Sequence, residues 1–479
     1  MLRDYSKAFE DCALYLPSVQ PPYARFAHSG EFKRKMPIEP RQLNFLDDQS
    51  CLFYYPNCLY SAGVAAKSDA SAKQTDDIVF NRDRSKTFCV CDSGGFQIST
   101  EAIPWEGNIT VERMLGWMEA RGDYCMALDF PTKNIGNGVI EKHTKALIDD
   151  CVDLVGFNKR NRLSLDYNAC LYLTDENNRA FTGLKASPST KFVNVMQGRN
   201  ERESKVWYEA MKGYPFSGWS FAGIHTRDLA LTLARILDMK SDGFLKDCEI
   251  IHFLGNTTLH LGCMYTAIKR AIKRAWGYDI AVTYDGSNPF SQIQFGTIYT
   301  GFILSRYGWC LLTDKLPRHA GGYQHQKFQD YCSECAREEL DNKEQRFIKR
   351  DKHLSRRVDV YGSPLAHGAS LFEGQSTIAS LLNFDQIEDS LLFNSVTDPA
   401  TGHLAINHNL HVVIDAHRWA QTAFRQKHVD QVPPELLLAE EAINYVLDWE
   451  HISASSHFCS HEPDPYVRLK NCAKLLDFT

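Results

Sequence analysis

Residues Asp92–Gln97 combine a carboxylate, a hydroxyl, two glycines, an aromatic ring and an amide within six positions. The apolar run before Asp92 predicts a buried strand that ends at this carboxylate. The glycines that follow, Gly94 and Gly95, allow a tight turn and the close approach of a flat ligand. A carboxylate at a strand end beside an aromatic ring, here Phe96, suits acid–base chemistry on a planar base. The simpler alternative is a turn in which Asp92 only caps a helix.

A second carboxylate, Asp285, occupies the same kind of position. It ends a run of β-branched and aromatic residues, and Gly286 after it keeps the approach open. Two carboxylates on either side of an anomeric carbon are the arrangement by which retaining enzymes exchange a glycosidic bond. Asp279, shortly before Asp285, is the alternative nucleophile, and an Asp-Gly turn at Asp285 is the non-catalytic alternative.

The same strand-then-polar arrangement recurs along the chain. Apolar runs end in turn at Asp92, Asp129, Gln197, Gly223, Gly255 and Asp285. Helical periodicity fills the intervals, over Val111–Arg121, Val139–Phe157, Asp228–Met239 and Met264–Trp276, and the long gap after Asp129 predicts an extra helix. Six such units predict an α/β fold, a (β/α)8 barrel in which the polar strand ends meet at one mouth. A doubly wound open sheet is the alternative, but no Gly-x-Gly-x-x-Gly follows an early strand.

Composition narrows the class of protein. Of 479 residues, 44% are hydrophobic and 23% charged, as in soluble globular proteins. We expect no membrane span and no signal peptide, and 15 scattered cysteines favour a reducing, cytoplasmic setting. Because the net charge is −6, any nucleic-acid partner must be held by a local basic patch.

The hexapeptide Asp92–Gln97 resembles the signature of the tRNA-guanine transglycosylase superfamily, whose members exchange a guanine in nucleic acid for a 7-deazaguanine. The resemblance implies that Asp92 is the general acid–base and Asp285 the nucleophile. It also implies a set of base-binding residues, which comprises Ser93, Gly94, Gly95, Phe96, Asp129, Gln197 and Gly223. In that set Phe96 stacks on the base. A carboxylate fits the N1–H and N2–H₂ donors of guanine, and an amide or backbone N–H fits O6.

A candidate metal site comes later in the chain. Cys332-Ser-Glu-Cys335 is a Cys-x-x-Cys pair, which alone is moderately specific for zinc. The superfamily carries Cys-x-Cys-x-x-Cys and a distant His-Asn-Leu, so the resemblance implies that Cys332, Cys335 and His408 bind Zn²⁺. Asp330 replaces the first cysteine of that pattern and is a candidate fourth ligand; Cys310 and His325 are the other candidates.

Basic residues follow the cysteine pair. They include Lys349, Arg350, Arg356 and Arg357, and such a one-signed run is typical of surfaces that neutralise phosphates. A second cluster between Lys269 and Arg274 is expected to be the solvated face of a barrel helix. A base within a duplex must be extruded before a buried carboxylate can reach its sugar.

These patterns predict three domains. We expect the barrel with an N-terminal extension over 1–324, a zinc-binding basic subdomain over 325–411, and the last barrel helix with a short helical tail over 412–479. The degraded cysteine motif and the short tail differ from the tRNA enzymes, and the resemblance is strongest to the branch that inserts 7-deazaguanine into DNA.

The expected function is therefore pentosyl transfer, in which guanine in DNA is replaced by a 7-deazaguanine of the preQ0 type through an aspartyl-glycosyl intermediate. A homodimer or accessory modification proteins are candidate partners. The alternatives are a tRNA-guanine transglycosylase and a non-catalytic nucleic-acid-binding subunit, although such a subunit is expected to lose one aspartate. A glycosidase for free sugars also uses two aspartates, but it needs neither a cysteine pair nor a basic run.

Overall fold

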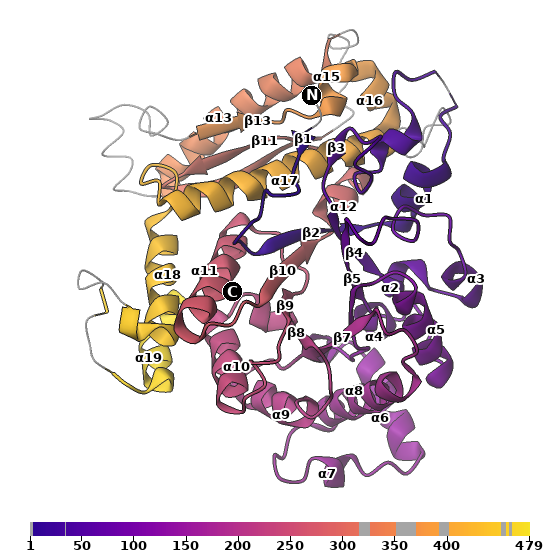
Figure 1. The fold of residues 1–479 in the computed structure, drawn as a ribbon, viewed down its shortest axis with the longest axis vertical. Helices are drawn as coiled ribbons and strands as arrows, with labels where there is room; N and C mark the ends of the chain where they lie inside the picture. The colour runs from indigo at the N-terminus through magenta and orange to yellow at the C-terminus, as the bar shows by residue number, and fades with distance from the viewer. Residues whose placement is uncertain are drawn as a thin grey trace.

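The structure is a computed structural model, and it describes residues 3–33, 35–315, 326–350, 370–391, 402–451, 457–458 and 462–479. Eight parallel strands close into a barrel surrounded by helices (Figure 1). In order around the wall they are β10 (Ala281–Gly286), β2 (Leu14–Val19), β4 (Asn57–Ser61), β5 (Phe88–Asp92), β6 (Tyr124–Met126), β7 (Lys191–Met196), β8 (Gly218–Phe221) and β9 (Ile250–Phe253). The prediction of a (β/α)8 barrel is confirmed, and the open-sheet alternative was wrong.

Two of the eight strands were not foreseen. β2 contains Pro17, and a proline within a short apolar run argues against a strand because it cannot donate to the ladder. Here Pro17 lies opposite Gly286 at the end of the β2–β10 pairing. β4 is a five-residue strand, Asn57–Ser61, that is buried throughout and gives no clear alternation of apolar and polar residues.

The helices that follow the strands form the outer layer. They are α1 (Pro21–Ser29), α2 (Ala62–Ala65), α3 (Asp69–Ala72), α4 (Gly95–Ser99), α5 (Asn108–Glu119), α6 (Val139–Asp149), α7 (Leu154–Phe157), α8 (Leu165–Leu184), α9 (Glu201–Met211), α10 (Leu229–Ser241), α11 (Leu259–Trp276) and α12 (Asn288–Gln294). Three helices, α6 to α8, occupy the long gap between β6 and β7, whose length predicted an extra helix. The single helix predicted over Val139–Phe157 is divided into α6 and α7.

The barrel interior is a small apolar cluster beneath a polar layer. The cluster takes side chains from successive strands: Leu16, Leu59, Val90, Met126, Val193, Val195, Ala222 and Ile250. Because side chains alternate between the two faces of a strand, the residues two positions after these also face inward. This alternation brings Ser61, Asp92 and His252 to the interior, one layer nearer the mouth than Leu59, Val90 and Ile250.

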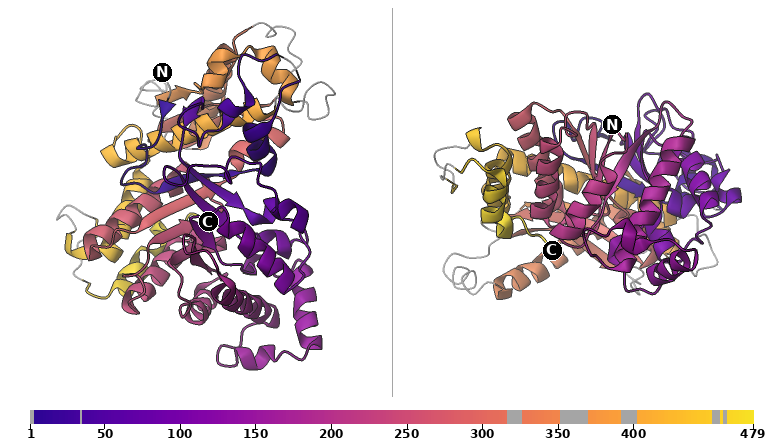
Figure 2. Two further views of the ribbon diagram at one scale, coloured as in Figure 1. Left: turned by 45° about the vertical axis from the view of Figure 1, so that its right-hand side comes forward. Right: turned by 90° about the horizontal axis from the view of Figure 1, so that it is seen from below.

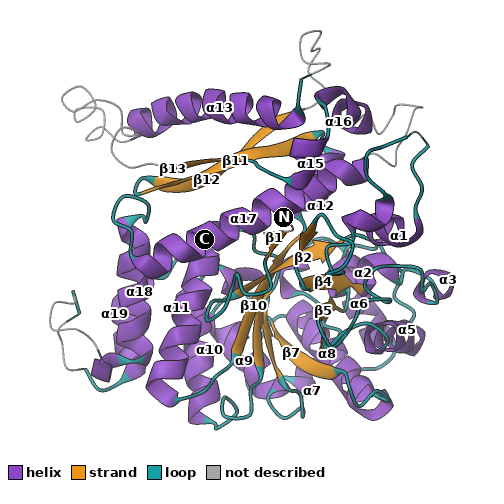
Figure 3. Cartoon of the chain, turned by 45° about the horizontal axis from the view of Figure 1, so that its top comes forward, coloured by secondary structure: helices purple, strands orange, loops and turns teal. Residues whose placement is uncertain are grey.

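The segment after α12 forms a separate three-stranded antiparallel sheet. Its strands are β11 (Thr297–Ser305), β12 (Gly308–Lys315) and β13 (Ser370–Glu373). Helix α13 (Phe328–Arg350) packs on one face of this sheet, and α17 (Gly402–Gln426) lies between the sheet and the barrel (Figure 3). Two short helices, α15 (Thr377–Leu381) and α16 (Phe384–Leu391), and the strand pair β1 (Arg3–Asp4) and β3 (Phe53–Tyr54) complete this end.

The sequence-based domain boundaries do not fall between structural units. β11 and β12 lie before residue 325 but pair within the same sheet as β13, and α17 runs without interruption across the expected boundary at 411/412. The last helices, α18 (Pro434–Leu447) and α19 (Pro465–Cys472), pack outside α11 and α10 (Figure 2). None of the helices described is long and apolar enough to cross a membrane.

Candidate active site at the barrel mouth

Asp92 is the last residue of β5, and the turn that follows holds its carboxylate. Ser61, its register partner on β4, donates a hydrogen bond from Oγ to Asp92 Oδ2 at 2.6 Å. The Gly94 N–H lies 3.4 Å from Asp92 Oδ1. Gly94 adopts φ +88°, a left-handed conformation that favours glycine, and its Cα packs against Gly63. The carboxylate is therefore fixed from two sides at the strand end.

Asp285 projects from β10 into the same interior and is 6% exposed. Its Oδ1 accepts the Gly255 N–H at 2.6 Å and lies 3.3 Å from Nε2 of His252 on β9. Gly286, the next residue, packs so closely against Thr257 that a Cβ there would overlap the threonine methyl group. The Gly255 N–H and the close packing at Gly286 therefore fix the position of the Asp285 carboxylate.

Asp129 and Gln197 form a third polar pair, on the loops after β6 and β7. Gln197 Nε2 donates to Asp129 Oδ2 at 2.7 Å, and both side chains are buried. Gly223, at φ +62° after β8, lies beside the amide oxygen of Gln197. The three residues that the resemblance assigned to base reading are therefore adjacent.

The three carboxylates are close enough to influence one another's charge. Burial raises the pKa of Asp92, with the charge of Asp285 adding to the rise, while the Ser61 hydrogen bond lowers it. Burial raises the pKa of Asp129 to about 7, and the charge of Asp92 adds to the rise. The raised pKa of Asp92 suits a group that gives and takes a proton.

The remaining residues of the hexapeptide shape this site differently. The Ser93 hydroxyl is buried and donates to the carbonyl of Ala127, so it ties two loops together. Gly95 is needed because a Cβ there would overlap the carbonyl of Asp129. Phe96 is 47% exposed on α4, with Lys133 Nζ 4.8 Å from its ring centroid, so the ring lies at the surface.

The alternative nucleophile, Asp279, does not belong to this site. It precedes β10, at the end of the barrel opposite the mouth, and its side chain is 70% exposed. Its partner is Lys273 on α11, at 3.2 Å. Of the two candidates, only Asp285 faces the barrel interior with Asp92.

Sequence reasoning missed three residues of the polar layer: Ser61, His252 and Thr283. His252 lies inside an apolar run, and Thr283 lies two residues before Asp285. The available signal was alternation, since in a barrel every second residue of a strand faces inward, and a polar residue there must find a partner. Ser61 could not be found in this way, because β4 itself was not predicted.

The proposed zinc ligands Cys332, Cys335 and His408 are buried beside the small sheet, but the two cysteines contact different residues. Cys332 Sγ is 3.9 Å from His408 Nε2, whereas Cys335 Sγ is 3.5 Å from Asp314 Oδ2. His408 also contacts the Tyr299 carbonyl and the Ser376 hydroxyl. Among the described residues no group of three or more His, Cys, Asp or Glu side chains is arranged to hold a metal.

The Cys-x-x-Cys pair lies within α13 and not on a turn, so both thiols face the sheet from one side of a helix. Asp330, two residues before Cys332, is exposed. Asp314, which contacts Cys335, is consequently better placed than the exposed Asp330 to join the cysteine pair. Cys310 is half-buried on β12, and His325 lies outside the described residues.

The basic residues proposed to bind nucleic acid can be placed only in part. Lys349 and Arg350 end α13, and Arg356 and Arg357 lie outside the described residues. The second cluster, on α11, makes contacts within the protein: Lys269 donates to the Cys12 carbonyl, and Arg274 pairs with Asp448 at 2.8 Å. These contacts show that the α11 cations help to pack the helix.

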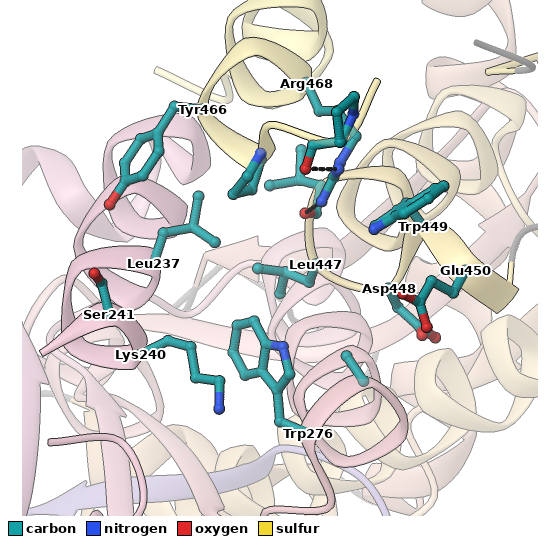
Figure 4. A pocket seen from close by; sticks show the side chains of 14 residues that line it. Leu237, Lys240, Ser241, Trp276, Leu447, Asp448, Trp449, Glu450, Tyr466 and Arg468 are labelled. Carbon is teal, nitrogen blue, oxygen red and sulfur yellow. Dashed lines mark hydrogen bonds between the residues drawn. The ribbon is translucent and has the colours of Figure 1, made fainter. Parts of the chain in front are cut away.

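A separate cavity of about 450 Å³ lies between the outer helices α10, α11, α18 and α19 (Figure 4). Trp276, Trp449 and Tyr466 line it together with Lys240 and Arg468. The Arg468 guanidinium donates to backbone carbonyls at the end of α18 and before α19, and Lys240 donates to the Tyr278 hydroxyl. Arg468 therefore fastens α19 to the end of α18, and Lys240 links α10 to the segment after α11.

No known protein-family model matches this sequence, and no curated protein matches it. The function is therefore argued from the geometry of the mouth and from the resemblance of the hexapeptide.

Proposed function

We propose that this protein is a base-exchange transglycosylase that replaces guanine in DNA with a 7-deazaguanine base of the preQ0 type. The observation that carries the proposal is that Asp92, Asp129 and Asp285 meet at the mouth of a parallel barrel. In enzymes with this fold the active site lies at the same end of the barrel. The resemblance of residues 92–97 to the guanine transglycosylases supports the substrate class.

The reaction needs two displacements at the anomeric carbon. In the first, a carboxylate oxygen of Asp285 attacks C1′, the bond to guanine breaks, and its electron pair leaves with the base, which takes a proton from Asp92. In the second, the incoming base gives a proton to Asp92 and attacks C1′, and Asp285 departs as carboxylate. The raised pKa of Asp92 fits a group that is an acid in one step and a base in the next.

Base selection is proposed for the Asp129–Gln197 pair and the adjoining Gly223. An ionised Asp129 accepts the N1–H and N2–H₂ donors of guanine, while the Gln197 amide fixes the carboxylate and offers a donor toward O6. A 7-deazaguanine keeps this edge unchanged, so one pocket serves the leaving and the incoming base. Phe96 can stack only if the base or its neighbour extends to the surface.

The choice of DNA over tRNA follows the resemblance to the DNA-modifying branch. The test uses the full chain with radiolabelled guanine and offers single-stranded DNA, duplex DNA and tRNA separately. We expect label in DNA, and unlabelled 7-deazaguanine should then displace it. Label in tRNA alone would defeat the DNA assignment, and no label in any polymer would defeat the enzymatic assignment.

We also propose that Cys332, Cys335 and His408 hold a structural Zn²⁺, with Asp314 as the fourth ligand. The donor set has the two thiols, one imidazole and one carboxylate that suit zinc. His408 Nε2 lies 3.9 Å from Cys332 Sγ but also 2.8 Å from the Tyr299 carbonyl, so the ion would have to replace the hydrogen that Nε2 gives to that carbonyl. Such an ion would fasten α13 and the sheet to α17, and no chemical step passes through it.

The zinc proposal predicts about one Zn²⁺ per chain. Cys332→Ser should release the metal and lower the melting temperature, because the ion contributes to folding. Metal content by mass spectrometry and a thermal melt measure both effects. Cys263→Ser, which alters a buried thiol on α11 that is not a candidate ligand, is the matched control and should keep the metal. Unchanged metal content in Cys332→Ser would remove the assignment.

A further inference from the structure

The Asp285 carboxylate is held by a histidine that the mechanism above does not use. His252 is fully buried, and its register partner across the β9–β10 pairing is Thr283. Both ring nitrogens are engaged: Nδ1 lies 2.7 Å from Thr283 Oγ1, and Nε2 lies 3.3 Å from Asp285 Oδ1. Three side chains on two neighbouring strands therefore form one continuous hydrogen-bonded chain.

Geometry decides which nitrogen of His252 carries hydrogen. A carboxylate oxygen only accepts, so the nitrogen facing Asp285 must present an N–H, and that nitrogen is Nε2. In the neutral ring, Nδ1 is then an acceptor, and the Thr283 hydroxyl is the donor that satisfies it. Thr283 thus selects the tautomer that His252 needs to donate to Asp285.

The two oxygens of Asp285 are treated differently. Oδ1 receives both the Gly255 N–H and the His252 N–H, whereas Oδ2 accepts no hydrogen bond from any residue that the structure describes. Hydrogen bonds to the charged form stabilise it and fix the plane of the carboxylate. The oxygen without a donor keeps its lone pairs available for attack on carbon.

We propose that His252 and Thr283 are positioning residues that hold Asp285 by Oδ1 so that Oδ2 is the attacking atom. This inference rests on the proposed function and adds to it. When Oδ2 bonds to C1′, Oδ1 becomes the ester carbonyl. When the incoming base attacks C1′, the C1′–Oδ2 bond breaks and its electron pair returns to the carboxylate. The two N–H donors stabilise the charge that reappears on Oδ1.

The positioning role of the Thr283–His252–Asp285 chain, here called the relay, is tested by single-turnover formation of the covalent enzyme–oligonucleotide complex. His252→Phe keeps a flat ring and removes the donor, and we expect the rate of adduct formation to fall about 10²-fold with little change in base affinity. His252→Gln restores an N–H near the position of Nε2 and should recover at least tenfold of that loss. Thr283→Val, which removes only the hydroxyl, should cost a smaller factor, about three- to tenfold.

The matched control is His417→Phe. His417 is another buried histidine; it contacts Tyr284 on the outer side of β10 and does not touch Asp285. It should leave the rate per folded molecule unchanged. An unchanged rate in His252→Phe, or no advantage of His252→Gln over His252→Phe, would overturn the relay. If the wild-type protein still exchanged bases, the proposed function would be unaffected by that result.

A second measurement does not depend on activity. In protein labelled with ¹⁵N-histidine, the resonances that disappear in His252→Gln belong to His252, and they should show hydrogen on Nε2. A hydrogen on Nδ1 alone would overturn the relay even if no base exchange were found. Absence of any adduct in the wild-type protein would instead count against the proposed function.

Discussion

The two ends of the barrel hold their buried carboxylates in opposite ways. At the mouth, Asp92, Asp129 and Asp285 are held by Ser61, by Gln197 and by a backbone N–H with His252. Within the described part of the chain, none of the three pairs with Lys or Arg. Their charges are held in place but are not neutralised by a permanent cation.

At the opposite end, two carboxylates, Asp123 and Asp77, have guanidinium partners. Asp123, which precedes β6, binds Arg82 at 2.8 Å and Arg84 at 3.4 Å. Asp77 lies 3.6 Å from Arg121, and both are buried. The Arg82 side chain is completely buried, so its charge is compensated where water cannot reach it.

The two ends of the barrel differ in what stabilises their carboxylates, and this difference bears on stability and on reactivity. Pairing with arginine favours the charged form of a carboxylate, although burial still raises the pKa of Asp77 beside Arg121. The mouth carboxylates have no such cation: burial raises the pKa of Asp92 and of Asp129, and the charge of a neighbouring carboxylate adds to each rise. The two ends therefore differ in their partners: the mouth carboxylates meet hydroxyl, amide, imidazole and backbone donors, and Asp77 and Asp123 meet guanidinium groups.

The largest expected effect is the loss of the nucleophile. Asp285→Asn should reduce adduct formation and base exchange by about 10⁴-fold, because an amide cannot form the glycosyl ester. The free energy of unfolding should stay the same or rise, since a buried charge is removed. Denaturing gels and urea titrations measure the two effects. An adduct that persists in Asp285→Asn would mean that another residue attacks.

The converse change is Asp123→Asn at the opposite end. It should lower the free energy of unfolding by about 3 kcal/mol, because Arg82 is left buried without its countercharge. The rate of exchange per folded molecule should not change. Urea titration and active-site counting separate the two quantities. If Asp123→Asn lowered the rate and spared stability, the division between the two ends of the barrel would be wrong.

Much of this division could be predicted from sequence, and the reasons are local. The strands ending at Asp92 and Asp285 are apolar runs with abrupt polar ends, so both carboxylates could be assigned to the mouth from the pattern alone. β2 was not predicted because it contains Pro17. Ser61, which holds Asp92, was missed because its strand, β4, was not predicted either. The partners of Asp285 depend on register between β9 and β10, which no local pattern encodes.

The cysteine pair shows a different limit. Spacing indicates which residues are able to share a metal, but it does not say whether they lie on a turn or on a helix. Here the pair lies within α13, and Asp314, which no motif marked, is the carboxylate that approaches Cys335.

A smaller effect is expected from the pH dependence of base binding. Because the pKa of Asp129 is raised to about 7, its ionised fraction, and with it the affinity for guanine, should rise about tenfold between pH 6 and 8. Asp129→Asn should bind guanine weakly and without this dependence. Equilibrium binding of labelled guanine at several pH values measures it. An affinity for guanine that falls with rising pH would contradict base binding by the ionised Asp129 carboxylate.

The same shift has a consequence for stability with the opposite sign. Since the folded-state pKa is higher than that of the unfolded chain, the folded protein binds the proton more readily. This contribution to stability is present below about pH 4 and is lost as pH rises toward 7. Asp129→Asn should remove it, so the difference in unfolding free energy between variant and wild type should grow with pH across that window.

The smallest effect concerns the hydroxyl that holds Asp92. Ser61→Ala removes the 2.6 Å hydrogen bond to Oδ2, which favours the charged carboxylate, so the pKa of Asp92 should rise further. The step in which Asp92 accepts a proton from the incoming base should then slow several-fold below neutral pH and recover at higher pH. Ser220→Ala, on β8, is the matched control, because its buried hydroxyl faces the Met126 sulfur and no carboxylate. A rate loss that is equal at all pH values would mean that Ser61 only packs the barrel wall, since a purely steric defect does not follow the titration of Asp92.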